Sequence, residues 1–431
     1  MKIHNQAREL QSGAPIESKK PLPHLSPASA ISMLIVLTLI NILNFLDRQL
    51  PFILAESIKR DLDLSDTQLG LLGGLAFALC YSTLALPLGR LADRWSPKLV
   101  LAGCVLVWSA MTAAGGLARN FGQLVTARFG VAVGEAGCMP AAHALIAQGI
   151  SPARRGLALG IFSMGVPIGT MLGLVLGGWI NDNADWRTAL LGAGAVGFFF
   201  IVLLLFLVPD VRAVNETRVR QPLSSALRPL WTSRAFRTLF VGTCLIGSSI
   251  YATLSFAAPY FIRIHGLTAT EAGLALGLTQ GILGVIGSIA GGRIFDRAAI
   301  GGHRNALLAP GLAFLLAAPA AAIAWFAPGK EVAIVFLALP LFAYVFYIPA
   351  AFGMAHVVAG KGNEAVASSV ILIGVGLLGA SFGPLVVGIL SDAFAPIFGV
   401  AGLRWALLYV ALANLLAGIV LLIANRRFAS A

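Results

Sequence analysis

GRLADR, at residues 89–94, recurs as GRIFDR at residues 292–297. Each copy follows a long apolar segment, and the aspartates Asp93 and Asp296 lie 203 positions apart in a chain of 431 residues. A second repeat, D-W-R-T-A-L-L at 185–191 and L-R-W-A-L-L at 403–408, opens the last apolar segment of each half. Two sets of spans related as parallel repeats are typical of transporters that rock two halves around a central site.

The composition predicts an all-α membrane protein. Hydrophobic residues make up 58% of the chain and charged residues 11%, which leaves too few charges to cover a soluble protein of this size. The apolar stretches are each long enough for a helix to cross the bilayer, which takes about 20 residues. We expect twelve transmembrane helices, near residues 28–57, 66–90, 97–118, 121–149, 155–180, 187–208, 236–263, 271–293, 304–326, 331–357, 364–391 and 403–425.

These spans divide the chain into five parts. A polar tail (1–27) precedes a first six-helix half (28–208), and a linker (209–235) rich in proline and arginine leads to a second six-helix half (236–425) and a short tail (426–431). Polar, proline-containing stretches of this kind connect domains.

The positive charges predict the orientation. Alternate loops and the tails on one side would carry 21 Lys and Arg, whereas the loops on the other side would carry 7. Positively charged loops remain in the cytoplasm, so we expect both termini there. The net charge of +12 is then explained by topology, and no nucleic-acid partner is expected.

The sequence contains no pattern typical of an enzyme. The four cysteines all fall in apolar spans without a C-x-x-C spacing, as small buried residues do. A nucleotide-binding loop, a metal-binding cluster and a nucleophile constellation are all missing from the sequence. We therefore expect neither cofactor nor metal, and a carrier powered by a gradient in place of ATP.

Four ionisable residues fall inside predicted spans, where charges are costly and usually functional. The adjacent Asp47 and Arg48 follow sixteen uncharged residues in the first span. Arg128 and Glu135 lie in the fourth span, seven residues apart and so on one helix face. At the helical rise, Asp47 lies roughly 6 Å and Arg128 roughly 9 Å outward from the middle of their spans, with Glu135 near the midplane.

Several of these residues carry a family resemblance. Gly89, Asp93 and Arg94 with Arg128 and the G-V-P-I-G at 165–169 resemble the motifs of the major facilitator superfamily. Within it, the sequences at 44–48 and 128–136 resemble the spinster branch. The resemblance implies a bacterial inner-membrane spinster homologue in which spans 1 and 4 line one cavity. It further implies a lysophospholipid or a sphingoid phosphate as substrate.

The charged cluster suggests proton coupling. Burial favours a neutral carboxyl and a nearby arginine favours the carboxylate, so a change in exposure would load or release a proton. We expect Asp47 and Glu135 to share this role while Arg48 switches between them. A static ion-pair lock between the two spans is the alternative. Arg128 is suited either to an anionic head group or to backbone carbonyls near a helix end.

The second half contrasts with the first, because its predicted spans contain no Asp, Glu, Lys or Arg within the membrane. One charged wall facing an apolar wall suits an amphiphile, with the head group at Arg48, Arg128 and Glu135. Polar candidates on the other wall are Tyr344 and Tyr347. A carrier of small organic anions or of lipophilic drugs is the alternative, followed by a channel, since charged groups also line pores.

The repeated hexapeptides suggest a cytoplasmic gate formed by Gly89, Asp93 and Arg94 with Asp296 and Arg297. A carboxylate at such a helix end can cap a neighbouring helix N-terminus. The alternative is a simple topology anchor. Glycine pairs spaced for helix packing fit within one bundle, so we expect a monomer whose partners are protons, membrane lipids and the substrate.

Overall fold

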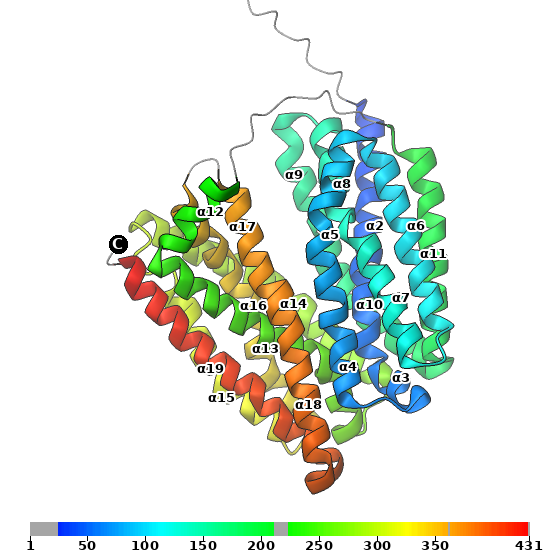
Figure 1. The fold of residues 1–431 in the computed structure, drawn as a ribbon, viewed down its shortest axis with the longest axis vertical. Coiled ribbons are helices and arrows are strands. Elements are labelled where there is room, and N and C mark those ends of the chain that lie inside the picture. Colours follow the sequence, from blue (N-terminus) through cyan, green and yellow to red (C-terminus); the bar gives the residue numbers. More distant parts are fainter. Residues whose placement is uncertain (1–24, 211–222, 361–362, 430–431) are drawn as a thin grey trace, which may run out of the picture.

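The computed structural model describes residues 25–210, 223–360 and 363–429, and within these ranges it contains helices and no strand. Two helical bundles lie side by side, joined through the linker (Figure 1). Helices α8 (Cys138–Gly149), α9 (Pro152–Ser163) and α12 (Leu223–Thr232) lie toward one end of the molecule, which we call the linker end; the opposite end is the far end. The tail 1–24 and linker residues 211–222 lie outside the described part.

The first half follows the predicted order of spans, with additional breaks. Its helices are α2 (Pro27–Ile53), α3 (Ala55–Leu62), α4 (Asp66–Gly73), α5 (Leu75–Arg94), α6 (Pro97–Gly116), α7 (Phe121–Ala136), α8 (Cys138–Gly149), α9 (Pro152–Ser163), α10 (Gly165–Asn183) and α11 (Trp186–Leu207). Side-chain caps from Ser96, Asn120 and Asp185 begin three of them.

The second half repeats this plan. Its elements are α12 (Leu223–Thr232), α13 (Arg234–His265), α14 (Ala269–Ile300), α15 (Leu308–Phe326), α16 (Lys330–Ala359), α17 (Glu364–Leu372), the π-helix η1 (Ile373–Gly379), α18 (Ala380–Phe398), the short 3-10 turn η2 (Gly399–Ala401) and α19 (Gly402–Ala429). The last helix continues through residues predicted as a tail, where Arg426 and Arg427 in its last turn are favoured by the helix dipole.

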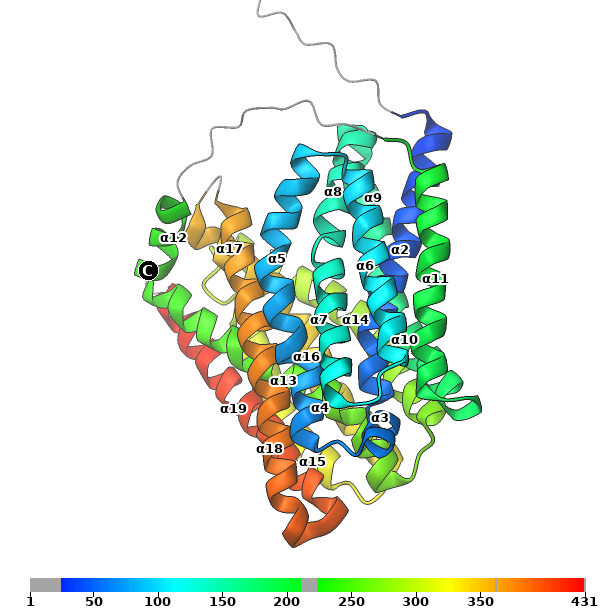
Figure 2. The same cartoon turned by 45° about the vertical axis from the view of Figure 1, so that its right-hand side comes forward.

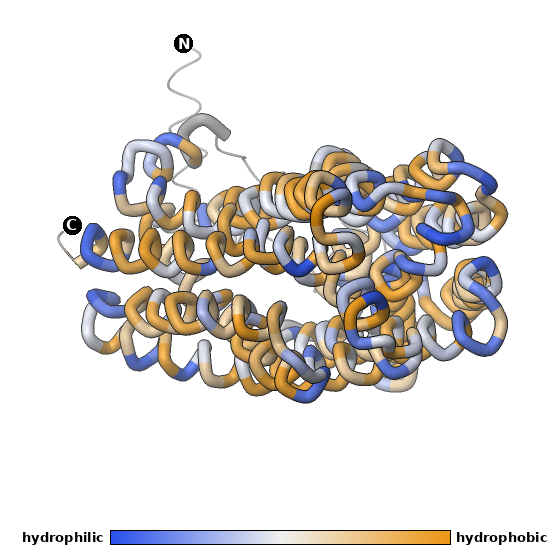
Figure 3. The backbone as a smooth tube through the Cα atoms, turned by 90° about the horizontal axis from the view of Figure 1, so that it is seen from below, coloured by the Kyte–Doolittle hydropathy of each residue, from blue (hydrophilic) through white to orange (hydrophobic). Residues whose placement is uncertain are grey.

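Ten segments within the described ranges are long and apolar enough to cross a membrane. One of them, Val366–Ala429, contains two of the predicted spans, whereas α4 and α5 are not among the ten. Hydrophobic positions run along the helices and hydrophilic ones gather mainly at turns and helix ends (Figure 3). The chain is thus a multi-pass membrane protein, although hydropathy and length alone do not fix the count at twelve.

Several predicted spans are interrupted where glycine weakens the helix. The second span breaks at Gly74 between α4 and α5, and the fourth breaks at Gly137 between α7 and α8. The eleventh contains η1, whose wider turn accompanies the close approach of Gly379 to Gly247 of α13. Such breaks are common at functional sites in membrane helices.

The two halves meet at the far end. There α10 packs against α14, and α4 packs against α18. A Cβ on Gly178 of α10 would collide with the carbonyl oxygen of Ala269, and one on Gly388 of α18 with that of Asp66. Glycine at both places therefore permits backbone contact between the halves. One hydrophobic core spans both halves at this end, while each half has a second core of its own.

At the linker end the halves are apart. Among the described residues, α8 and α9 make no substantial packing contact with any helix of the second half. The separation of the two bundles at this end is visible in two views (Figures 1 and 2). The structure therefore represents a conformation closed at the far end.

Candidate functional site

The intramembrane cluster centres on an ion pair between α2 and α7. Arg48 Nε donates to Glu135 Oε2 at 2.6 Å. The Glu135 side chain is fully buried, whereas 18% of the Arg48 side chain remains exposed. Spans 1 and 4 therefore do face each other, and Arg48 is the accessible member of the pair. A buried carboxylate requires such a charge-assisted bond.

Aromatic rings fix the Arg48 guanidinium in place. Its central carbon lies 4.5 Å from the Tyr81 ring centroid, 4.9 Å from that of Phe45 and 5.2 Å from that of Phe77. Cations over aromatic faces are attracted by the ring quadrupole, by about 2 kcal/mol when desolvated. Phe77 also contacts Arg128, whose central guanidinium carbon lies 4.7 Å from the ring centroid. Both arginines thus contact the same ring.

Asp47 lies next to this pair without joining it. Only 2% of the residue is exposed, and its Oδ2 accepts a 3.3 Å hydrogen bond from the Thr112 hydroxyl of α6. Its Oδ1 has no hydrogen-bond partner among the described residues. Arg128 and Glu135 are close enough to act on its charge, yet neither forms an ion pair with it. The four predicted residues are therefore assembled, with the carboxylates unequally partnered.

The tyrosines of the second half are placed differently from one another. Tyr347 is 1% exposed and packs edge-on against Phe314, with ring centroids 5.9 Å apart, in the core of its own half. Tyr344 is half-buried and lies near Tyr251 of α13, which in turn is within electrostatic reach of Arg48. Tyr251 is thus the tyrosine of the second half within electrostatic reach of Arg48, and Tyr344 lies near Tyr251. The substrate-binding role of Tyr347 stays a prediction.

The residues predicted to form a cytoplasmic gate are only partly described by the structure. Asp296 and Arg297 are exposed near the end of α14, and no ion pair of theirs is found within the described ranges. Gly89 of α5 lies against Pro140 of α8 in its own half. The side chains of Asp93 and Arg94 lie outside the described residues, so their roles stay predictions.

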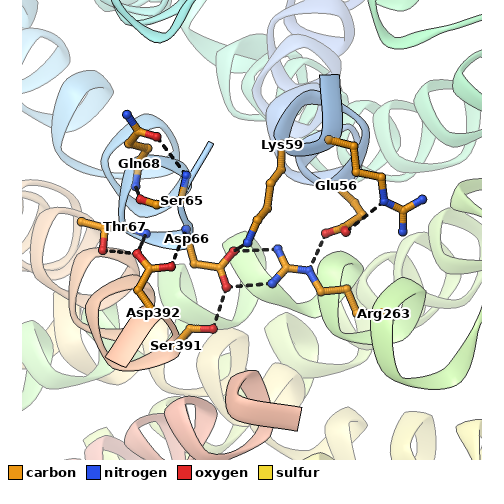
Figure 4. Close-up of polar contacts among 10 residues, drawn as sticks. Glu56, Lys59, Ser65, Asp66, Thr67, Gln68, Arg263, Ser391 and Asp392 are labelled. Atoms are coloured by element: carbon orange, nitrogen blue, oxygen red, sulfur yellow. Dashed lines mark hydrogen bonds and ion pairs between the residues drawn. The ribbon is translucent and has the colours of Figure 1, made fainter. Parts of the chain in front are cut away.

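The far end holds a network of ion pairs that crosses between the halves (Figure 4). Arg263 of α13 donates two 2.7 Å bonds to Asp66 of α4 and a 2.5 Å bond to Glu56 of α3. Lys59 and Ser391 each bind the same Asp66 at 2.6 Å. The network lines a cavity of about 410 Å³ that opens at the far end.

Asp66 is the anion at the centre of this network and lies at a helix start, outside the ten apolar spans. Burial alone would raise the pKa of its carboxyl, but bonds from Arg263, Lys59 and Ser391 outweigh burial and lower the pKa to about 2. Asp66 is thus charged at any ordinary pH, which keeps the network intact.

Two carboxylates close the far end in matching positions. Asp392, near the end of α18, accepts bonds from the backbone and hydroxyl of Thr67 at 2.8 and 2.6 Å. Asp182, at the end of α10, accepts the corresponding bonds from Thr270, both at 2.6 Å. Each carboxylate holds the N-terminus of a helix in the opposite half, where the helix dipole favours an anion.

A repeated sequence pattern corresponds to this arrangement, and it was not among the predicted motifs. The pattern G-x-x-x-x-G-x-x-x-D occurs at residues 173–182 and again at 383–392. Its aspartates are Asp182 and Asp392, and its central glycines are the two that contact the opposite half. Lys59 and Arg263 are two of the seven loop charges predicted for this side, and hydropathy separates spans from loops but does not show which loops meet.

Comparison with known proteins gives consistent results. A family model described as Major Facilitator Superfamily matches residues 37–384. An MFS-type efflux pump of Mycolicibacterium smegmatis is 33% identical over 393 residues, covering 91% of each chain. Protein spinster homolog 1 of Homo sapiens is 30% identical over 257 residues, which cover 57% of this chain and 48% of the relative.

A solved structure also resembles this one closely. It is a bacterial homolog of the human lysosomal transporter Spinster, in an inward-facing and unoccupied conformation. The TM-score is 0.85 at 27% sequence identity, and the match covers 94% of this chain and 98% of that one.

Proposed function

We propose that this chain, which belongs to the Major Facilitator Superfamily and is a spinster-like secondary transporter, moves an amphiphilic, lipid-like substrate by proton-coupled alternating access. The observation that carries the proposal is the unequal partnering of two neighbouring buried carboxyls. Glu135 is held by Arg48 at 2.6 Å, whereas Asp47 forms no ion pair within the described ranges and accepts a 3.3 Å bond from the Thr112 hydroxyl.

The coupling follows from the cost of burying charge. An isolated carboxylate is expensive to bury and one bonded to arginine is not, so Asp47 favours its protonated form here while Glu135 favours its ionised form. When the halves rock to close the linker end, Arg48 moves from Glu135 to the adjacent Asp47. Asp47 then passes its proton to Glu135, which releases it on the linker side when the halves rock back and Arg48 returns to Glu135. A static lock would leave transport independent of protons.

The exposure of Arg48 supports a role in substrate binding. It is the accessible cation of the cluster, and a planar guanidinium matches phosphate or carboxylate. An anionic head group that binds Arg48 withdraws it from Glu135, which links loading of substrate to loading of a proton. Helices α13 and α16 of the second half offer mainly aromatic and aliphatic side chains, with Tyr251 within electrostatic reach of Arg48 and Tyr344 near Tyr251, and suit an acyl chain.

The proposed orientation places the linker end in the cytoplasm of a bacterial inner membrane, on the argument of positive loops. The far-end network then closes the outer side, and the structure is inward-facing. The transporter acts as a monomer in this scheme, since the two halves within one chain supply both walls of the path.

A flux comparison tests the substrate class. Purified protein in liposomes is given a lysophospholipid, a sphingoid phosphate, a sugar acid and a lipophilic cation side by side, with and without a proton gradient. Saturable, gradient-dependent flux of one of the two lipids supports the proposal. Flux of the sugar acid or the cation alone would establish one of the rival carriers, and flux that fails to saturate would indicate a channel.

A further inference from the structure

A small cavity lies beside Asp47 in the first half. Its volume is about 30 Å³, and all of its lining residues belong to the first half. Asp47, Thr112 and Arg128 form its polar part, and the remaining walls are largely apolar. This volume accommodates about one or two water molecules.

Two buried atoms of its lining residues have no hydrogen-bond partner in the part of the chain that the structure describes. They are Oδ1 of Asp47 and Nε of Arg128, on side chains that belong to residues only 2% and 7% exposed. Buried polar atoms are nearly always hydrogen-bonded, to protein or to ordered water. The Trp108 indole on α6 is close to Asp47, but its N–H forms no hydrogen bond within the described ranges.

The cavity extends from Asp47 toward the far end. Gly115 lies at the last turns of α6, Leu124 at the first turn of α7 and Leu190 near the start of α11. Ile58 of α3 lines it as well. All four positions lie at the far-end side of the bundle, so the cavity continues from the buried carboxyl toward the side that the ion-pair network closes.

We propose that this cavity holds water bonded to Asp47 and Arg128, and that it admits protons to Asp47 from the far end while the substrate path is open only at the linker end. The inference rests on the proposed function, since it supplies a route to the proposed proton carrier. The charged groups around that carboxyl are Glu135 and Arg128 of α7 and the neighbouring Arg48. The substrate and the proton would then enter by separate routes.

Gly115 offers a direct way to fill the cavity. A Cβ there would lie 3.6 Å from Leu190 and 3.7 Å from Ala127, in ordinary contact, so a larger side chain projects into the cavity without a backbone clash. Gly103 lies on the same helix with nothing within 4 Å of an added Cβ. Gly115→Leu therefore fills the cavity, and Gly103→Leu is the matched control. Ala127→Leu fills the same cavity from α7.

The experiment is an acid jump on the far-end side of oriented liposomes on a solid support, with no substrate present, recording the transient current of proton binding. Wild type and Gly103→Leu should give equal currents, and Gly115→Leu and Ala127→Leu should reduce the current at least fivefold. Equilibrium infrared titration in detergent should still detect protonation of Asp47 in the filled variants, which shows that they are folded.

The outcomes separate the two proposals. Undiminished current in both filled variants overturns the water route and leaves proton coupling standing. Current that persists in Asp47→Asn shows that Asp47 is not the proton acceptor and overturns the proposed function itself. The infrared carbonyl band of protonated Asp47 should also shift upward in Gly115→Leu as its bond to water is lost, and an unshifted band contradicts the water site.

Discussion

Neutralising Asp66 should open the far end. The pKa of this carboxyl falls from an ordinary value near 3.8 to about 2 in the closed network, which corresponds to about 2 kcal/mol of stabilisation of the charged form. Opening the network exposes Asp66 to water, so this stabilisation of the charged carboxylate is lost. Asp66→Asn should therefore raise the ratio of open to closed conformations roughly 30-fold, since 1.4 kcal/mol is a factor of about ten.

Spin-label distances across the far end measure this ratio. Labels at Arg119, in the first half, and Ile397, in the second, are exposed and outside the network. Asp66→Asn should increase the population at long distance. Asp61→Asn is the matched control, because Asp61 pairs with Arg187 of its own half. Identical distance distributions in Asp66→Asn and wild type would refute the role of the network in closure.

Four further predictions concern the far-end network and the Arg48–Glu135 cluster. Because the pKa of Asp66 is lowered, the network stabilises closure above pH 3.8 and is lost only as the pH falls toward about 2, so far-end label distances should not change between about pH 8 and pH 5. Asp392→Asn should weaken closure by about 1–2 kcal/mol, seen as a partial gain of the long label distance, because a charged acceptor of three bonds is lost. Gly178→Val should prevent closure by backbone collision and arrest transport, whereas Gly103→Val, in open space, should leave flux unchanged. Arg48→Lys should reduce lipid flux at least tenfold in liposomes, because an ammonium cannot reproduce both the bond from Nε to Glu135 and the contacts of the planar guanidinium with three rings.

Much of the fold follows from the sequence because hydropathy records burial in lipid directly. The membrane class, the two repeated halves and the family were all predicted, and the structure and comparisons confirm them. Helix breaks such as those at Gly74 and Gly137 were missed, since glycine is frequent throughout this chain and most of its glycines do not interrupt a helix.

The site was only partly predictable. Helical rise and periodicity placed Asp47, Arg128 and Glu135 at similar depths, and the family resemblance implied that their two spans face each other, as the Arg48–Glu135 ion pair does. The sequence could not show that Arg48 forms its ion pair with Glu135 and not with Asp47, since this depends on side-chain geometry within a few ångströms. The far-end network joins α3, α4, α13 and α18, and only tertiary packing brings those segments into contact.

Proton dependence of lipid flux is the most direct test of whether Asp47 and Glu135 couple transport to protons. Uptake of a lysophospholipid into liposomes would be compared with and without a proton gradient for wild type, Asp47→Asn, Glu135→Gln and the control Asp61→Asn. Coupling through these two carboxyls predicts gradient-dependent flux in wild type and Asp61→Asn. Asp47→Asn and Glu135→Gln should each lose the dependence of flux on the proton gradient. Full proton dependence retained in both Asp47→Asn and Glu135→Gln would contradict this coupling.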